Sequence, residues 1–203
     1  MILPTISKAS PLILASSSPR RKRLLEQIGL PFRSVPSKVA EKRITEDPSA
    51  NARLLAERKA RAVLYESHNN WILGADTMVV LGERILGKPE DHDDAQSMLL
   101  QLSAKEHRVI TGFCLLDPSS KMAYAEAITT LVKMKPLSEE EISAYIATGE
   151  PFGKAGSYAI QGIGSFLVEA ISGSYTNVVG LPVCALIKAL LATGALEIFP
   201  LAS

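Results

Sequence analysis

Residues 12–29 read Leu-Ile-Leu-Ala-Ser-Ser-Ser-Pro-Arg-Arg-Lys-Arg-Leu-Leu-Glu-Gln-Ile-Gly, and this stretch decides the fold class. Its four leading apolar residues, 12–15, predict a short buried strand. Ser18 suits the N-cap of a helix and Pro19 suits its first turn, so we expect a helix over residues 19–28 that ends at Gly29. A buried strand that leads directly into a helix is typical of α/β proteins.

The turn between this strand and this helix is also a candidate anion site. Helix N-termini present unpaired N–H groups and a partial positive charge, both of which favour phosphate. Arg20 and Arg21 add forked donors in the first turn, where a cation opposes the helix dipole. That local cost is easier to understand if an anion binds there. The alternative is a capped surface helix with solvated arginines.

The remainder of the chain keeps the alternation of strand-like and helical patterns. Ser138 and Glu141 form a capping-box pattern, and Pro182 suits the start of the last helix. Because the chain shows no internal repeat and no linker, we expect one α/β domain over residues 1–203, in two lobes around a shared core. The expected helices span residues 49–65, 94–102, 138–149 and 182–191, and the expected strands span residues 71–73, 77–81, 84–86, 108–116 and 124–134.

The composition excludes several classes of protein. Hydrophobic residues make up 47% and charged residues 21% of the 203 residues, as in ordinary folded proteins. With 22 Lys and Arg against 21 Asp and Glu, no charge excess favours nucleic acid or a membrane surface as a partner. Cys114 and Cys184 lie in apolar runs, so we expect two buried free thiols and a reducing cytoplasm. No run reaches membrane-spanning length.

Asp76 is the candidate catalytic carboxylate. It follows Gly74-Ala75 between two apolar segments, and burying an acid there is costly unless it is paired or binds a cation. Asp76 could therefore hold a magnesium ion, activate water, or do both; the alternative is a turn-forming aspartate.

Residues 82–89 nearly match a phosphate-binding loop, but Pro89 lacks the required hydroxyl. We therefore expect a hairpin there, with Lys88 as a candidate phosphate contact.

Three further candidates are weak when each is taken alone. Lys59 lies in a helix with many charges, and Glu41 lies in a polar stretch, so each resembles an ordinary surface residue. Residues 153–164 carry four glycines among residues of buried type, which favours an ordered loop over a flexible one. Such a loop can bring the Gln161 amide close to a flat ligand.

Together these segments resemble the Maf family of nucleoside triphosphate pyrophosphatases. The resemblance follows the family's order from Leu14 to Pro182, and although each motif is short, the ordered set is specific. The matching motifs are Leu-Ala-Ser-Ser-Ser-Pro-Arg-Arg, Val-Pro-Ser followed by Glu41, Arg-Leu-Leu-Ala-Glu-Arg-Lys-Ala, Gly-Ala-Asp-Thr, Leu-Gly-Lys-Pro, His-Arg-Val-Ile-Thr-Gly, Gly-Glu-Pro, Lys-Ala-Gly-Ser-Tyr-Ala-Ile-Gln-Gly and Asn-Val-Val-Gly-Leu-Pro.

The resemblance implies a fold, a reaction and a set of site residues. It implies an elongated, inosine triphosphatase-like fold, with a mixed sheet flanked by helices and the nucleotide in a cleft between two lobes. It implies hydrolysis of a nucleoside triphosphate to the monophosphate and pyrophosphate, with Asp76 as the base. A divalent cation, Mg²⁺ or Mn²⁺, would be held by Glu41 and Asp76, and a homodimer is compatible with the family. The residues expected to bind the triphosphate are Ser16, Ser18, Arg20, Arg21, Lys59 and Lys88.

The resemblance extends to the substrate. Arg20, Thr77 and Gln161 match the branch that acts on dTTP and UTP, and an amide can both donate to and accept from a uracil-type edge. The chain departs from that branch at Gly153, where aspartate is usual, and at Ala40, where an acid is common. These departures bear on the substrate and not on the reaction, because Asp76 is retained.

Two other functions compete with this hypothesis. One is a regulatory module linked to cell division that binds a nucleotide without turnover; the retention of Asp76 with Lys59 and Lys88 argues against it. The other is a nucleic-acid binder built on the basic residues 20–23, which the balanced charge and the absence of interspersed aromatic residues disfavour.

Overall fold

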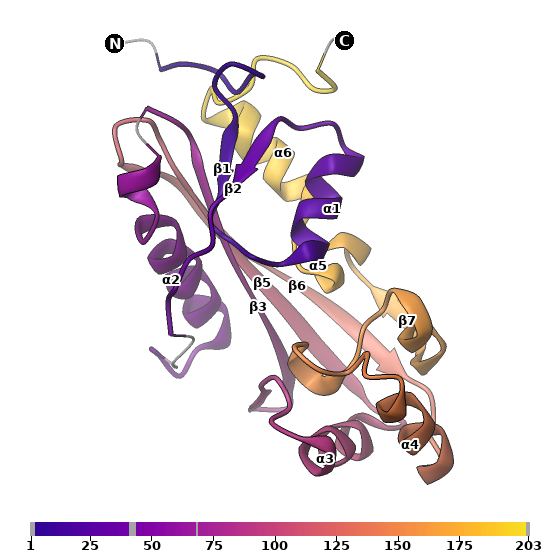
Figure 1. Cartoon of the computed structure of the whole chain (residues 1–203). Helices are drawn as coiled ribbons and strands as arrows, with labels where there is room; N and C mark the ends of the chain where they lie inside the picture. The colour runs from indigo at the N-terminus through magenta and orange to yellow at the C-terminus, as the bar shows by residue number, and fades with distance from the viewer. Residues whose placement is uncertain (1–2, 41–43, 68, 202–203) are drawn as a thin grey trace. The chain divides into compact units, whose positions relative to one another are not determined.

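The computed structural model describes residues 3–40, 44–67 and 69–201 and confirms the α/β class (Figure 1). Its seven-stranded sheet has the order β2-β1-β3-β5-β6-β7, with β4 paired to β3. The sheet is mixed, because β1 runs parallel to β2 and β3, whereas β4 and β7 run antiparallel to their partners. In chain order the strands and α-helices are β1 (Leu12–Leu14), α1 (Pro19–Gln27), β2 (Phe32–Ser34), α2 (Pro48–Arg61), β3 (Ile72–Leu81), β4 (Arg84–Leu86), α3 (His92–Leu102), β5 (Glu106–Leu116), β6 (Met122–Met134), α4 (Glu139–Ala147), β7 (Val168–Ser172), α5 (Tyr175–Val179) and α6 (Val183–Ala192), and the 3₁₀-helices are η1 (Leu64–Glu66), η2 (Ala155–Ser157) and η3 (Gly162–Leu167).

The chain divides into two compact units. Unit 1 comprises Met1–Asp76, Thr111–Ile128 and Gly180–Ser203, and unit 2 comprises Thr77–Ile110 and Thr129–Val179. Three of the boundaries between the units fall inside long strands, namely β3, β5 and β6. The expectation of a single domain over residues 1–203 stays a prediction.

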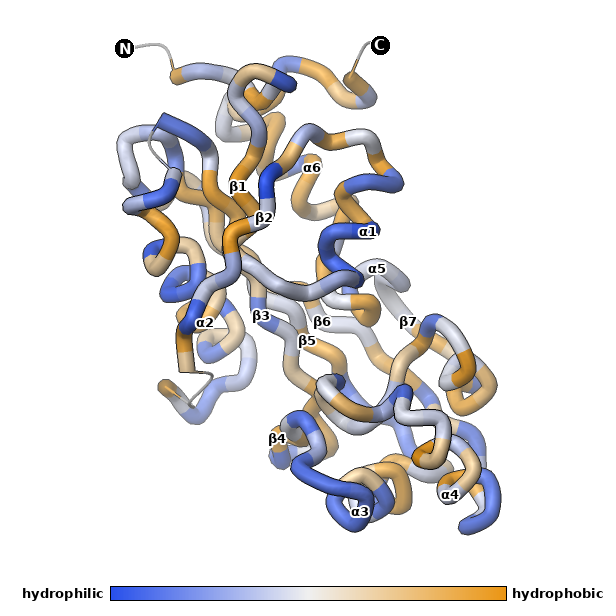
Figure 2. The backbone as a smooth tube through the Cα atoms, in the orientation of Figure 1, coloured by the Kyte–Doolittle hydropathy of each residue, from blue (hydrophilic) through white to orange (hydrophobic). Residues whose placement is uncertain are grey.

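Unit 1 begins with the strand–turn–helix of the opening stretch. Ile13 pairs with Ile72 and with Arg33, so β1 lies between two parallel neighbours. The N-cap of α1 is Ser18, whose side chain accepts from Arg21 N, and Pro19 follows at the first helical position, as expected. Figure 2 shows apolar residues along β1 and hydrophilic ones at the start of α1. Strand β2 was not expected, since three residues of mixed polarity carry no clear strand pattern.

Helix α2 lies against the sheet at two glycines. A Cβ built on Gly74 in β3 would lie 2.0 Å from Ala56 O and 2.8 Å from Ala60 N. A Cβ on Gly112 in β5 would lie 2.4 Å from Ala52 O. Because real side chains never approach so closely, only glycine at both positions allows this packing, and the alanines of α2 supply the other half of the contact.

The expected interruption of the strand at residues 74–76 is wrong. Strand β3 runs without a break from Ile72 to Leu81, with the buried Asp76 inside it. Gly74 has no side chain because α2 covers it, and not because the chain turns there. The expected hairpin is confirmed, since Val79 pairs with Leu86 and Leu81 with Arg84.

Unit 2 has its own apolar core, built around Leu99, Leu102, Val132, Ile142 and Tyr145. Helix α4 begins with the predicted capping box, in which the Ser138 and Glu141 side chains each accept from the other's backbone N–H. The glycine-rich residues 153–164 form an ordered segment that includes η2 and the start of η3, as expected.

The prediction for the two cysteines is half right. Both are free, and Cys114 is buried, but Cys184 is exposed. Helix α6 turns Leu186, Ala189 and Leu190 inward, so Cys184 lies on its outer face despite the apolar residues around it. Among the described helices, none combines the length and the apolar character that spanning a membrane requires.

We predict that Gly74→Ala lowers the free energy of unfolding by about 2–3 kcal/mol, because the new methyl group overlaps the backbone of α2. Thermal unfolding would show a fall of roughly 5–10 °C in the midpoint for a protein of this size. The control is Gly87→Ala, since a Cβ there meets nothing within 4 Å. An equal loss in both variants would contradict the close-packing argument.

Candidate active site

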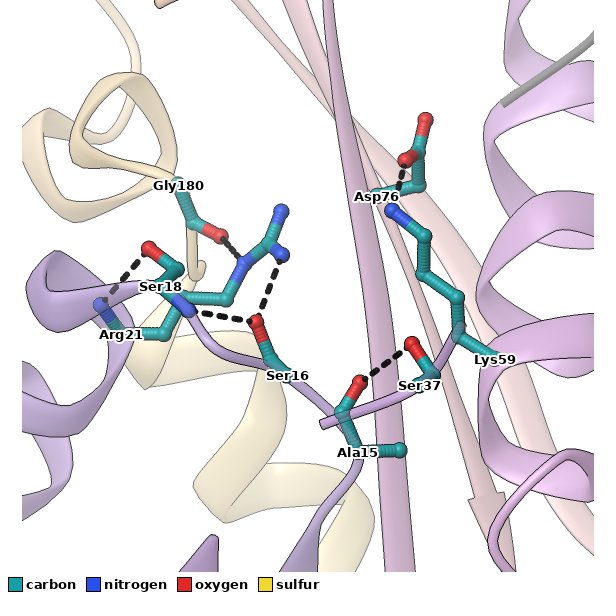
Figure 3. Close-up of polar contacts among 8 residues, drawn as sticks. All are labelled: Ala15, Ser16, Ser18, Arg21, Ser37, Lys59, Asp76 and Gly180. Atoms are coloured by element: carbon teal, nitrogen blue, oxygen red, sulfur yellow. Dashed lines mark hydrogen bonds and ion pairs between the residues drawn. The ribbon is translucent and has the colours of Figure 1, made fainter. Parts of the chain in front are cut away.

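An ion pair between Lys59 and Asp76 forms the centre of the candidate site (Figure 3). Lys59 Nζ lies 2.6 Å from Asp76 Oδ1, and each side chain is 7% exposed. Lys59 comes from α2 and Asp76 from β3, so the glycine contact at Gly74 sets the distance between them. Each charge compensates the desolvation of the other, because an unpaired buried charge is strongly destabilising.

The carboxylate of Asp76 retains an oxygen for a ligand. Figure 3 shows Oδ1 facing the Lys59 ammonium group and the second oxygen directed away from it. A carboxylate oxygen in this position can ligate a hard cation or accept a proton from water. The alternative of a turn-forming aspartate is excluded, because Asp76 lies inside a regular strand.

The turn between β1 and α1 is organised by hydroxyl groups. Ser16 Oγ accepts from Ser18 N and from Arg21 Nη1, both at 3.2 Å. Ser18 Oγ accepts from Arg21 N at 3.4 Å (Figure 3). Ser34 and Ser37 hold the adjacent main chain, donating to Ser16 O and Ala15 O. These bonds fix the turn that leads into the N-terminus of α1.

The two arginines of this turn have different environments. Arg21 is 8% exposed, and its Nε donates to Gly180 O at 2.8 Å, so it ties α1 to the segment before α6. Arg20 is half-buried, and burial lowers the pKa of its guanidinium from the ordinary value. A desolvated cation gains most from an anion placed beside it. The contact to Gly180 was not anticipated, because every residue has a backbone carbonyl and the sequence does not show which one a side chain will reach.

The remaining candidate residues are placed as follows. Thr77 follows Asp76 in β3 and is half-buried, Lys88 is exposed after β4, and Gln161 is the half-buried N-cap of η3. These three belong to unit 2, whereas Ser16, Ser18, Arg20, Arg21, Lys59 and Asp76 belong to unit 1. Glu41 lies outside the described residues.

The segment that carries Gln161 is anchored in unit 2 by a buried polar pair. His107 Nε2 lies 2.7 Å from Tyr158 OH, with the two rings packed edge to face. Gly153 has φ +74°, a left-handed conformation that glycine adopts without strain. Burial lowers the pKa of His107 to about 4, so the imidazole is neutral at pH 7.

One described carboxylate, that of Asp76, could contribute to a divalent cation site. Within residues 3–40, 44–67 and 69–201, no three or more histidine, cysteine, aspartate or glutamate side chains are grouped to hold a metal. Mg²⁺, however, is usually bound through one or two carboxylates together with substrate phosphates and water. The outward oxygen of Asp76 fits that pattern of coordination.

Known proteins with similar sequences share one family. The family model described as Maf-like protein matches residues 11–193. The dTTP/UTP pyrophosphatase of Ruminiclostridium cellulolyticum is 53% identical over 173 residues, which cover 84% of this chain and 90% of that protein. The dTTP/UTP pyrophosphatase of Syntrophotalea carbinolica is 49% identical over 193 residues, which cover 94% of this chain and 88% of that protein. Among solved structures, the Ham1 protein of Staphylococcus aureus is 14% identical with a TM-score of 0.42, over 62% of this chain and 72% of that chain.

We predict that Arg21→Met lowers the free energy of unfolding by about 2–3 kcal/mol, because it removes charge-assisted hydrogen bonds to Ser16 and Gly180. The adjacent Arg20→Met serves as the matched control and should change stability by no more than about 1 kcal/mol. Urea unfolding of both variants makes the comparison. A larger loss in Arg20→Met would reverse the structural assignment of the two arginines.

His107 predicts a pH dependence of stability. Its folded pKa of about 4 lies below the ordinary value of 6.5, so its contribution is present above pH 6.5 and is lost as pH falls towards 4. Between pH 7 and pH 5 this group alone accounts for about 2 kcal/mol. Urea unfolding of His107→Gln should therefore show a weaker loss over this interval than the unmodified protein. An equal loss in His107→Gln and in the unmodified protein would contradict this assignment.

Proposed function

Because this chain belongs to the Maf family, we propose that it hydrolyses dTTP and UTP to the monophosphate and pyrophosphate, and so removes particular nucleotides from the pool. The observation that carries the proposal is the buried Lys59–Asp76 pair, found in a chain about half identical to proteins named dTTP/UTP pyrophosphatase. A binding module would have no need of a carboxylate held ready to accept a proton.

Asp76 is the proposed general base. Its outward oxygen accepts a proton from water, and that water attacks phosphorus in line with the α–β anhydride bond, which breaks to release pyrophosphate. Lys59 keeps the carboxylate in place through the 2.6 Å contact to Oδ1. One oxygen of Asp76 thus acts as the base, while the other holds Lys59, which is proposed to bind the phosphates.

The proposed triphosphate site combines the turn before α1 with the lysines. Ser16 and Ser18 present hydroxyls at a helix N-terminus, and Arg20 supplies a desolvated guanidinium. Arg21 positions this turn through Ser16 and Gly180, besides any donor it directs to phosphate. Lys59 and Lys88 add positive charge that offsets the charge developing on the phosphates.

Asp76, together with Glu41, is proposed to hold the divalent cation, Mg²⁺ or Mn²⁺. When bound, the cation would neutralise phosphate charge and lower the pKa of a coordinated water. The described carboxylate supplies one ligand, and the triphosphate and water would complete the shell.

Thr77 and Gln161 are proposed to select the base. The Gln161 amide can donate to the O4 carbonyl and accept from the N3–H of uracil or thymine, a pairing that cytosine would present in reverse. Sites that pair polar groups in this way reject the wrong base strongly, because a mismatch leaves groups unpaired.

A cytoplasmic location, the absence of nucleic-acid and membrane partners, and assembly as a homodimer complete the proposal. The free thiols of Cys114 and Cys184 are in keeping with a reducing compartment. A division-linked module that binds nucleotide without turnover is not favoured, since the relatives are named pyrophosphatases and the proposed base is present.

The test is pyrophosphate release from dTTP, UTP, CTP, GTP, ATP and 7-methyl-GTP with Mg²⁺ or Mn²⁺, beside Asp76→Asn. We expect dTTP and UTP to be preferred, and the variant to lose at least about a hundredfold in kcat, the contribution typical of a general base. Asparagine still offers Lys59 an oxygen, so binding of a non-hydrolysable dTTP analogue should persist.

Glu57→Gln is the control, since it makes the same acid-to-amide change on α2 at a residue paired with Arg61. Its turnover should match that of the unmodified protein. Full activity in Asp76→Asn would refute the proposed base, and release from purine nucleotides alone would refute the proposed substrate.

A further inference from the structure

Two side chains in unit 2, Tyr145 and Glu150, hold the segment that contains Gln161 from both sides. Tyr145 is a buried residue in the last turn of α4, and Glu150 follows the helix in the Gly-Glu-Pro motif. Neither residue has a role in the hydrolysis described above. Both are separated from Gln161 by at least ten residues in sequence, yet their polar atoms contact its main-chain neighbours.

Tyr145 contacts the residues before Gln161. Its hydroxyl accepts from Ala159 N at 3.2 Å and donates to Glu150 Oε1 at 3.1 Å. The side chain is 1% exposed, and burial raises the pKa of the phenol, so the hydroxyl keeps the proton that it donates. The ring packs edge to face on Phe166.

Glu150 contacts the residues after Gln161. Its Oε2 accepts from Ile163 N at 3.0 Å, and its Oε1 accepts from Gly164 N at 2.9 Å. Burial acts to raise the pKa of this carboxyl, but the bonds from Gly164, Ile163 and Tyr145 prevail and lower it. Glu150 is therefore an ionised acceptor, and bonds to an ionised acceptor are the stronger kind.

Glycines make these contacts sterically feasible. Gly162 has φ +72°, and a Cβ there would lie 2.7 Å from Glu150 Oε2. A Cβ on Gly164 would lie 2.4 Å from Tyr145 OH. The glycine spacing of this segment thus matches the positions of the two polar side chains, which is difficult to explain if the segment were only a connection.

The consequence concerns the orientation of the Gln161 amide. An amide that is free to turn over can pair with uracil in one orientation and with cytosine in the other, because its donor and acceptor exchange places. Discrimination between these bases therefore requires the amide to be held in one place, and a fixed main chain is a precondition for that. The three N–H groups held by Tyr145 and Glu150 belong to residues 159, 163 and 164, which bracket Gln161.

We propose that Tyr145 and Glu150 are positioning residues for base selection, which fix the main chain on both sides of Gln161 so that its amide meets the base in one orientation. This inference rests on the proposed role of Gln161 in substrate choice. It adds two residues to the specificity apparatus without giving either a contact to the nucleotide.

The experiment measures the ratio of kcat/KM for UTP to that for CTP in Glu150→Gln and Tyr145→Phe. Each variant should lower this ratio about tenfold, a change comparable to the loss of one charge-assisted hydrogen bond. Amide hydrogen exchange at residues 159, 163 and 164 should become faster in both. If Glu150→Gln does not fold, Tyr145→Phe decides the matter, since it removes one oxygen from a ring that stays packed.

The matched controls are Glu169→Gln and Tyr175→Phe, which make the same changes at exposed positions of unit 2. Neither should alter the UTP to CTP ratio. A merely structural role for Tyr145 and Glu150 would lower stability or total activity while leaving this ratio unchanged, and that result would overturn the proposal.

Gln161→Ala separates this inference from its premise. Alone it should lower the ratio, and adding Glu150→Gln to it should change the ratio by less than about twofold, because residues acting through one another are not additive. A ratio altered by Gln161→Ala but not by Glu150→Gln or Tyr145→Phe would refute the positioning role only. A ratio unaltered by Gln161→Ala would refute the role of Gln161 itself, and fully additive effects would show that Glu150 acts independently of it.

Discussion

Helix α2 lies so close to β3 and β5 that a methyl group at Gly74 or Gly112 would overlap its backbone. This approach brings Lys59 within 2.6 Å of Asp76, although one residue belongs to a helix and the other to a strand seventeen residues later. Burying both charges is tolerable only because they neutralise one another at short range. A helix displaced outward by a methyl group would force the Lys59 side chain to extend further to keep this contact. The proposed chemistry of the site therefore depends on two residues that have no side chain.

The turn before α1 likewise depends on a few close contacts. The N-terminus of a helix offers N–H donors to an anion, but it does so reliably only if the turn itself is rigid. Ser16 accepts two hydrogen bonds within the turn, and Arg21 extends the network to Gly180. Arg21 thus has its positive charge buried in the framework, whereas Arg20 has a half-buried charge that an anion would stabilise. The adjacent arginines of one motif differ in role because successive residues of a helix point in different directions.

Much of the fold could be predicted from the sequence, because its signals are local. The Ser18-Pro19 helix start, the capping box of α4 and the β3–β4 hairpin depend on neighbouring residues alone. The break expected at Gly74 was wrong, since a glycine needed for a close helix contact looks the same in sequence as one needed for a turn. Cys184 was misplaced for a similar reason, as an apolar run does not say which face of a helix is buried. Asp76 could be singled out as a candidate from its apolar flanks. The pairing with Lys59 was not, because it is a tertiary distance.

Glycines permit close contacts in both units. Gly74 and Gly112 bring a helix backbone to a strand, while Gly162 and Gly164 bring a loop backbone to the oxygens of Glu150 and Tyr145. In each case the absence of a side chain determines how close a polar group or a backbone can come. The types of residue in a site therefore predict which reaction it can perform. How well the site distinguishes one base from another depends instead on close contacts between backbone and side chain, which glycine permits. Apart from Thr77, substitutions that alter selectivity without altering the reaction should accordingly concentrate around residues 145–164 of this chain, away from the proposed catalytic carboxylate.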